Sequence, residues 1–343
     1  MNSYEYKKLN KYLNELSLYF QKRDIFYIDN IAEINKMSNL FYNKFFPLNL
    51  TDDSTINTLT YEDVYSLAFE IIENIAPYYL KDFQNIIKNG ILDFGYNNEY
   101  NGSYFRHTKN HNEININRVF NYNDVISLIH EFIHYTSGKR INTINRNIIS
   151  EFLAIYFELV AMKYLVDKGI SIQEIDYKKR LRGIFEYTKF YLDVNKPITC
   201  FFKCGSASKR NYEFCIENKW ISEYGDFDKN CKKLLNSFIK LEKNYKNSVF
   251  SFEYNDESLR NNISFGYSYL VKYILGISLT FYALKCCDIK DILNLNSLIN
   301  YFNEFDIKEV LKKFGIDMNN IDFYDNINIS IDEFINNYNI KQR

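Results

Sequence analysis

Two histidines four residues apart mark the stretch of sequence best suited to chemistry, His130-Glu131-Phe132-Ile133-His134. Residues with this spacing lie on one face of a helix, so both imidazoles can reach one zinc ion. The carboxylate of Glu131 can then act on a water molecule at the metal. The chain has only 4 histidines, so chance seldom produces this pattern. The motif predicts a zinc site; two solvated histidines on a surface helix are the alternative.

A zinc site of this kind needs a third protein ligand, because catalytic zinc usually takes three protein groups and a water. Glu151 and Glu158 follow on the next predicted helix, with a spacing that places both on the same face. Burying a carboxylate in an apolar stretch is costly unless it is paired or coordinated. We therefore predict that Glu151 binds the metal and that Glu158 is the partner of a ligand histidine. An exposed stripe of carboxylates is the alternative.

The elements that must hold these residues are predicted to be mainly helices. Apolar residues with helical spacing indicate helices over 4–20, 61–89, about 124–138 and 147–168. Pro77 is expected to kink or restart the second, Asn123 or Asp124 to cap the third, and Gly169 to follow the fourth. The alternation of polar and apolar residues in 113–117 predicts a strand. Residues 170–260 are expected to form further helices, with a loop at 197–209.

Two further segments with helical character have an unusual composition, because one is almost free of charges and the other is strongly basic. Residues 263–287 contain a single charge, Lys272, and are long enough to cross a membrane. A mid-segment lysine and several hydroxyl groups favour a buried helix over a membrane span. The basic residues Lys178, Lys179, Arg180 and Arg182 are interpreted as a solvated helix face.

The composition narrows the class of protein. The chain has 343 residues, of which 46% are apolar, and its 42 basic and 43 acidic residues nearly balance. This excludes a disordered chain, and the lack of net positive charge argues against a nucleic-acid partner. The first residues lack the apolar stretch of a secretory signal, so a cytoplasmic location is expected. No linker is evident. We predict one catalytic domain over 1–343, with an N-terminal helical segment, 1–60, and a zinc-binding core, 61–343.

Six cysteines are interpreted as free thiols, because a chain of this length needs no disulfides. Cys200, Cys204 and Cys215 lack the spacing of paired zinc thiolates, so a second metal site there is discounted.

The zinc motif and its neighbours also resemble a known family. NYNDVISLIHEFIHYT, followed by SEFLAIYFELVAMKYL, resembles the zinc metallopeptidases of the oligoendopeptidase F family, relatives of thimet oligopeptidase. The resemblance extends in the same order over roughly residues 40–340, through LTYEDVYSLAFEIIENIAPYY, ILDFGYNNEYNGSYF, EININ, SYLVKYILG and VLKKFGIDMNNIDFYDNINISIDEFI. It implies a zincin-like (gluzincin) helical metallopeptidase domain with a small β-sheet flanking the active site. It also implies a short form that lacks the family's N-terminal half.

The resemblance implies roles for individual residues. His130, His134 and Glu151 would bind one Zn²⁺ per chain, and Glu131 would be the general base. Peptide substrates would lie along Gly102, Ser103, Tyr104 and Phe105, and Tyr269 and Tyr273 would support the tetrahedral intermediate. Ile263 and Val271 depart from the family pattern, which suggests His and Tyr at these places.

The predicted function is zinc-dependent hydrolysis of internal bonds in short peptides. An aminopeptidase-type gluzincin is one alternative, although no Gly-x-Met-Glu-Asn element is present to recognise a free amino terminus. A non-catalytic peptide-binding or membrane-associated relative is the other.

Overall fold

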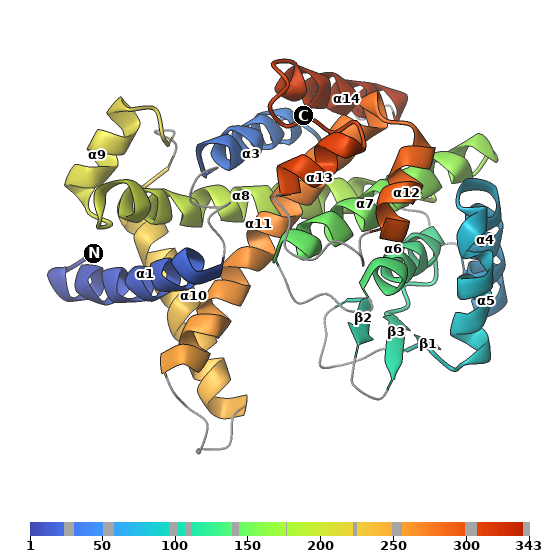
Figure 1. Cartoon of the computed structure of the whole chain (residues 1–343), viewed down its shortest axis with the longest axis horizontal. Helices are drawn as coiled ribbons and strands as arrows, with labels where there is room; N and C mark the ends of the chain where they lie inside the picture. The colour runs from blue at the N-terminus through green and yellow to red at the C-terminus, as the bar shows by residue number, and fades with distance from the viewer. Residues whose placement is uncertain are drawn as a thin grey trace. The chain divides into compact units, whose positions relative to one another are not determined.

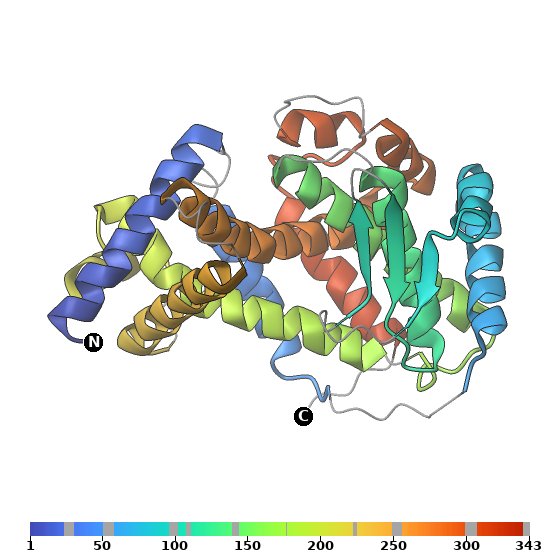
Figure 2. The same ribbon diagram turned by 90° about the horizontal axis from the view of Figure 1, so that it is seen from below.

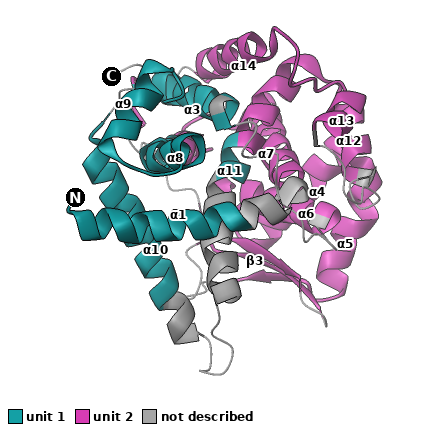
Figure 3. Ribbon diagram, turned by 60° about the vertical axis from the view of Figure 1, so that its left-hand side comes forward, with its two compact units in different colours: residues 1–46, 185–274 teal, residues 47–184, 275–343 magenta. Residues whose placement is uncertain are grey.

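The chain forms two compact units, each built from two separate segments of sequence (Figure 3). The first unit comprises residues 1–46 and 185–274, and the second comprises 47–184 and 275–343. The computed structural model describes residues 1–23, 31–50, 58–95, 102–107, 111–138, 144–175, 177–221, 225–248, 256–298 and 307–338. The two units do not share the bounds of the segments 1–60 and 61–343, and one catalytic domain over 1–343 stays a prediction.

The first unit is helical throughout its described residues. Its elements are α1 (Ser3–Arg23), α3 (Ile31–Phe45), α9 (Lys209–Glu217), α10 (Phe227–Ser248), and parts of α8 (Tyr177–Cys204) and α11 (Asp256–Cys286). Helix α1 packs on α10, where the ring centroids of Tyr12 and Phe238 are 5.4 Å apart, and Leu13 of α1 is fully buried. An apolar face on each helix therefore forms this core.

The second unit contains the zinc motif. Its elements are α4 (Tyr61–Ile75), the 3₁₀ turn η1 (Pro77–Tyr79), α5 (Leu80–Lys88), β1 (Leu92–Phe94), β2 (Tyr104–His107), β3 (Asn112–Ile116), α6 (Tyr122–Gly138), α7 (Ile144–Asp167), α12 (Ile289–Leu298), α13 (Ile307–Lys313) and α14 (Phe323–Asn337), with the rest of α8 and α11 (Figure 1). Helices α6 and α7 pack on each other, and Phe132 and Phe157 are fully buried in this core. The ring of Phe83 from α5 meets Phe132 edge to face at 4.9 Å.

The three strands form one small sheet in the order β1-β3-β2. The central strand β3 pairs in parallel with β1 and in antiparallel with β2, so Ile114 lies opposite both Leu92 and Phe105. Strands β2 and β3 contact α6, which lies behind the sheet in Figure 2. The predicted fold class, mainly α with a small sheet beside the zinc helix, is confirmed.

Several predicted boundaries are confirmed by the structure. Residues 61–89 form α4 and α5, and the chain restarts at Pro77 in the turn between them. Helix α7 ends at Asp167, and Gly169 follows in the left-handed region with φ +91°. The amide N–H of Gly169 donates to the carbonyl of Val166, as in a glycine C-terminal cap.

The prediction of a loop at 197–209 is wrong for most of these residues. Helix α8 continues through Pro197 to Cys204, and only a short turn, beginning at Gly205 with φ +79°, precedes α9. Proline inside a helix costs about 3 kcal/mol through a lost hydrogen bond and ring crowding. Because Ile198 and Cys200 are fully buried next to it, packing outweighs that cost.

Helix α6 begins at Tyr122, ahead of the predicted caps. Asp124 lies inside its first turn and accepts hydrogen bonds from the backbone N–H groups of Val119 and Phe120, at 2.9 and 3.0 Å. Its buried carboxylate also pairs with the guanidinium of Arg118 at 2.9 Å. Asp124 therefore fixes the approach of the chain to the helix rather than capping the helix.

The apolar segment 263–287 belongs to α11 up to Cys286, and Cys287 follows the end of the helix. Among the residues that the structure describes, no helix combines the length and apolarity that a membrane crossing needs.

Candidate metal centre

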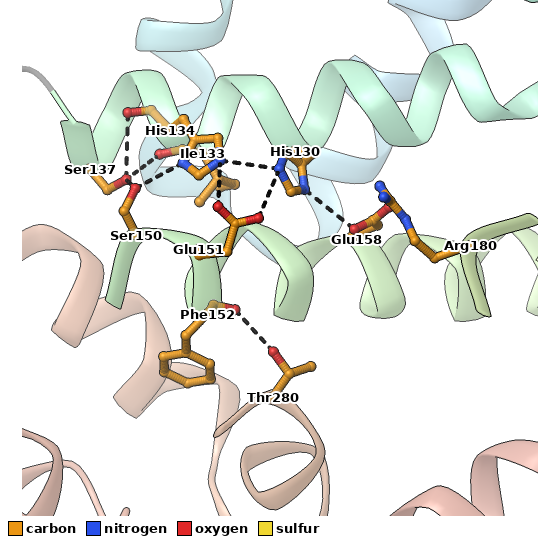
Figure 4. A network of polar contacts seen from close by, with 10 residues as sticks. All are labelled: His130, Ile133, His134, Ser137, Ser150, Glu151, Phe152, Glu158, Arg180 and Thr280. Carbon is orange, nitrogen blue, oxygen red and sulfur yellow. Dashed lines mark hydrogen bonds and ion pairs between the residues drawn. The ribbon is translucent and has the colours of Figure 1, made fainter. Parts of the chain in front are cut away.

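Two adjacent helices of the second unit bring together the predicted metal ligands. Helix α6 supplies His130 and His134, and α7 supplies Glu151 (Figure 4). The two Nε2 atoms are 3.1 Å apart, and the Glu151 carboxylate oxygens lie 3.8 Å from Nε2 of His130 and 3.7 Å from Nε2 of His134. Within the described part of the chain, these three residues form the only group of three or more with the spacing of metal ligands.

The other nitrogen of each imidazole faces away from this centre. Nδ1 of His130 lies 3.3 Å from Oε2 of Glu158, and Nδ1 of His134 lies 2.8 Å from Oγ of Ser150. A carboxylate accepts, so Nδ1 of His130 carries the proton and Nε2 presents a lone pair. Glu158 is therefore a hydrogen-bond partner of His130 and is fully buried, and the roles of both residues at a metal stay predictions.

The donor set fits a zinc ion. Two imidazole nitrogens and a fully buried carboxylate converge within 3.1 to 3.8 Å, and a cation at their centre would offset the resulting repulsion between lone pairs. Ligand atoms around a tetrahedral zinc with bonds of about 2.0 to 2.2 Å lie roughly 3.3 to 3.6 Å apart.

A close contact with α11 sets the position of Glu151. Gly276 lies against α7, where an added Cβ would be 3.1 Å from the backbone nitrogen of Phe152 and 3.3 Å from Cβ of Glu151. One turn later, Oγ of Thr280 lies 3.2 Å from the carbonyl oxygen of Phe152. The absence of a side chain at position 276 therefore allows α11 to approach the helix that carries Glu151.

Arg180, interpreted as part of a solvated face, keeps 39% of its side chain exposed but also has a specific partner. Its guanidinium forms an ion pair with Oε1 of the buried Glu158, on the side opposite His130 (Figure 4). Arg182 is also engaged, because its Nε donates to the carbonyl of Leu50 at 2.9 Å. A buried carboxylate needs a compensating charge, and the guanidinium of Arg180 supplies it.

Glu131, the predicted general base, is buried on α6 with 8% of its surface exposed. The residues predicted to flank a substrate, Gly102 to Phe105, lie at the start of and along β2, which is an edge strand of the described sheet. The ring of Phe105 meets Tyr135, the neighbour of His134, edge to face at 5.9 Å. Thus β2 packs on the zinc helix, and its role in binding peptides stays a prediction.

The two predicted oxyanion tyrosines belong to the first unit, whereas the predicted metal ligands belong to the second. The side chain of Tyr269 lies outside the described residues. Tyr273 belongs to the first unit, where its ring stacks on Tyr187 with centroids 4.9 Å apart. Their catalytic roles therefore stay predictions.

Sequence reasoning missed three residues around this centre: Ser137, Ser150 and Arg180. Ser150 directly precedes Glu151, and Ser137 lies one turn after His134. Hydroxyl groups inside apolar helical stretches, next to predicted ligands, are the signal that points to them. By contrast, Arg180 is distant in sequence from Glu158, so no local pattern reveals their contact.

No protein-family model and no curated protein matches the sequence. Among solved structures, the chain is similar to a protein of Bacillus anthracis str. Ames assigned as an oligoendopeptidase F, with 11% identity, a TM-score of 0.47, and coverage of 94% of this chain and 56% of that one. PZ peptidase A, solved with an inhibitor, gives 12% identity, a TM-score of 0.43, and coverage of 98% and 59%. The chain thus spans under two thirds of each of these proteins.

Proposed function

We propose that this protein is a zinc-dependent metallopeptidase that hydrolyses internal bonds of short peptides. The observation that carries the proposal is the convergence of His130, His134 and Glu151 on one centre, with Glu131 next to the first ligand on the same helix. These residues would hold one zinc ion per chain. The resemblance of the sequence to the oligoendopeptidase F family supports the same reaction.

The proposed chemistry divides between the metal and the protein. When bound, zinc lowers the pKa of water and polarises the carbonyl of the scissile bond. Glu131 takes one proton from the attacking water and passes it to the leaving amine. Glu158 holds His130 through Nδ1, so that Nε2 of this ligand keeps its direction.

The substrate would bind as an extended peptide along the outer edge of β2. In the described sheet, β2 pairs with β3 on one side only, so its other side can add a strand. Pairing of this kind requires an extended peptide. Folded proteins are therefore expected to be poor substrates.

The decisive experiment compares Glu131→Gln with the wild type. Glutamine keeps the size of the side chain but cannot accept the proton, so we expect stoichiometric zinc and a fall in turnover of about 10²- to 10⁴-fold. Zinc content is measured by elemental analysis, and cleavage of a quenched peptide library is measured by mass spectrometry with and without a chelator. Glu70→Gln, on α4 of the same unit, is the matched control and should leave both unchanged.

A zinc-loaded Glu131→Gln variant that cleaves at the wild-type rate would refute the role of Glu131. A wild-type protein that binds zinc but cleaves no peptide favours a peptide-binding relative instead. Release of single N-terminal residues would identify an aminopeptidase.

A further inference from the structure

We propose that Ser150 and Ser137 form a hydrogen-bond relay that fixes the tautomer of His134 and so directs its Nε2 lone pair at the metal. The inference rests on the proposed zinc site and assigns positioning roles to two residues. It concerns His134, whose Nδ1 lies 2.8 Å from Oγ of Ser150.

The direction of the relay follows from its far end. Oγ of Ser137 lies 2.7 Å from the carbonyl oxygen of Ile133, one turn earlier in α6. A carbonyl can only accept, so Ser137 donates its single hydroxyl proton in this hydrogen bond. Oγ of Ser137 is also 3.0 Å from Oγ of Ser150. In that contact Ser137 must accept, and Ser150 must donate.

The direction of these two hydrogen bonds also determines which nitrogen of the His134 imidazole carries the proton. The hydroxyl proton of Ser150 lies in its hydrogen bond to Ser137. The oxygen of Ser150 can therefore only accept from Nδ1 of His134, 2.8 Å away. Nδ1 of His134 therefore carries a proton, and in the neutral ring Nε2 must present a lone pair. Three consecutive donors thus lead from the ligand to a backbone carbonyl (Figure 4).

Burial makes the relay rigid. Ser137 is fully buried and Ser150 is 7% exposed, so water competes little for these hydroxyl groups. Reversing the chain would leave the hydrogen bond from Ser137 to the carbonyl of Ile133 unmade in this buried setting, which disfavours the reversed arrangement. The relay also links α6 to α7 at Ser150, the residue before Glu151. It therefore ties the positions of two ligands from different helices together.

The tautomer can be tested on the metal-free protein by nitrogen NMR of the histidine rings at alkaline pH, where the imidazoles are neutral. The chain has only 4 histidines, so the signals can be assigned by single substitutions. We expect His134 to carry its proton on Nδ1 in the wild type. A ring protonated on Nε2 would overturn the proposal, whether or not the protein hydrolyses peptides.

Zinc affinity supplies the second readout, measured by competition with a chromophoric chelator. Ser150→Ala should weaken zinc binding on the order of 10- to 100-fold and give a mixture of His134 tautomers. Ser137→Ala removes only the end of the relay and should weaken binding roughly fivefold, as for one neutral hydrogen bond. Ser150→Thr keeps the hydroxyl group and should restore the wild-type tautomer.

Ser38→Ala is the matched control. Ser38 is fully buried in α3 of the first unit, and its hydroxyl donates to the carbonyl of Ile34 at 2.8 Å, as Ser137 does to Ile133. It should alter stability without changing zinc affinity or the tautomer. If Ser150→Ala does not fold, Ser137→Ala and the wild-type spectrum still decide the question. Wild-type protein that fails to bind zinc contradicts the proposed function; zinc-binding protein in which both serine variants keep wild-type affinity contradicts the relay alone.

Discussion

Glu151 and Glu158 are both fully buried glutamates on α7, yet they contact different partners. Both oxygens of Glu151 face imidazole Nε2 atoms at distances too long for hydrogen bonds but suited to a shared cation. Glu158 instead lies between Nδ1 of His130 and the guanidinium of Arg180. The seven-residue spacing predicts that both carboxylates share a face. Their partners distinguish Glu151, the proposed metal ligand, from Glu158.

Removing each carboxylate should therefore have different effects on zinc. Glu151→Ala deletes a ligand, so we expect most of the bound zinc to be lost. Glu158→Gln keeps the side-chain volume and weakens the support of His130, so zinc affinity should fall about 10- to 100-fold. Zinc content after dialysis and chelator competition measure the two effects. If Glu158→Gln loses more zinc than Glu151→Ala, the assignment of the ligand is wrong.

At the scale of elements, the proposed zinc centre includes Glu151 of α7, a helix that packs closely against α11. Gly276 is buried, and its backbone approaches Phe152 and Glu151 so closely that even a methyl group must displace α7. Position 276 is therefore a spacer for Glu151, the proposed metal ligand on another helix. The usual advantage of alanine over glycine inside a helix should be reversed here.

We expect Gly276→Ala to destabilise the protein by about 1 to 3 kcal/mol, as overpacked sites do, and to weaken zinc binding by moving Glu151. Thermal unfolding of the metal-free protein and zinc competition are the measurements. Gly183→Ala is the matched control, because Gly183 lies inside α8 with no atom within 4 Å of an added Cβ. That variant should gain about 0.5 to 1 kcal/mol and keep its zinc affinity. Equal behaviour of the two variants would argue against the spacer role.

The sequence predicted the elements better than their contacts. Helical periodicity and the glycine after α7 placed the two ligand-bearing helices to within a few residues, because these signals are local. The approach of Gly276 to α7 and the pairing of Arg180 with Glu158 depend on packing between segments distant in sequence. The prediction at Pro197 failed for a related reason. Proline locally favours the end of a helix, but tertiary packing of its buried neighbours overrides this preference.

At the scale of the whole molecule, the proposed metal ligands belong to the second unit. The first unit contains a separate cluster of polar contacts around Asp228. Asp228 of α10 accepts from the hydroxyl of Tyr6 in α1 at 2.5 Å. Its carboxylate also pairs with Lys209 of α9 at 3.0 Å and with the amino group of Met1 at 3.3 Å. One carboxylate thus connects three helices of the unit.

These partners make the first unit sensitive to acid. The hydrogen bond from Tyr6, assisted by Lys209 and the amino terminus, lowers the pKa of Asp228 from its ordinary 3.8 to about 2. A carboxyl whose pKa is lower in the folded state stabilises the fold fully above its unfolded pKa. That contribution declines as the pH falls from about 4 to about 2, because the native carboxylate then becomes protonated.

Asp228→Asn should therefore destabilise the protein at neutral pH, by about 1 kcal/mol because the site is partly exposed to solvent. The difference from the wild type should shrink as the pH falls through that window, since the wild-type carboxylate is then neutral as well. Denaturant unfolding, followed at a series of pH values, gives the comparison. Asp167→Asn is the control: Asp167 pairs with Lys163 on the exposed surface of α7, and its loss should have little effect at any pH. A difference between wild type and Asp228→Asn that stays constant from neutral pH to about pH 2 would show that packing, rather than the charge of Asp228, connects the three helices.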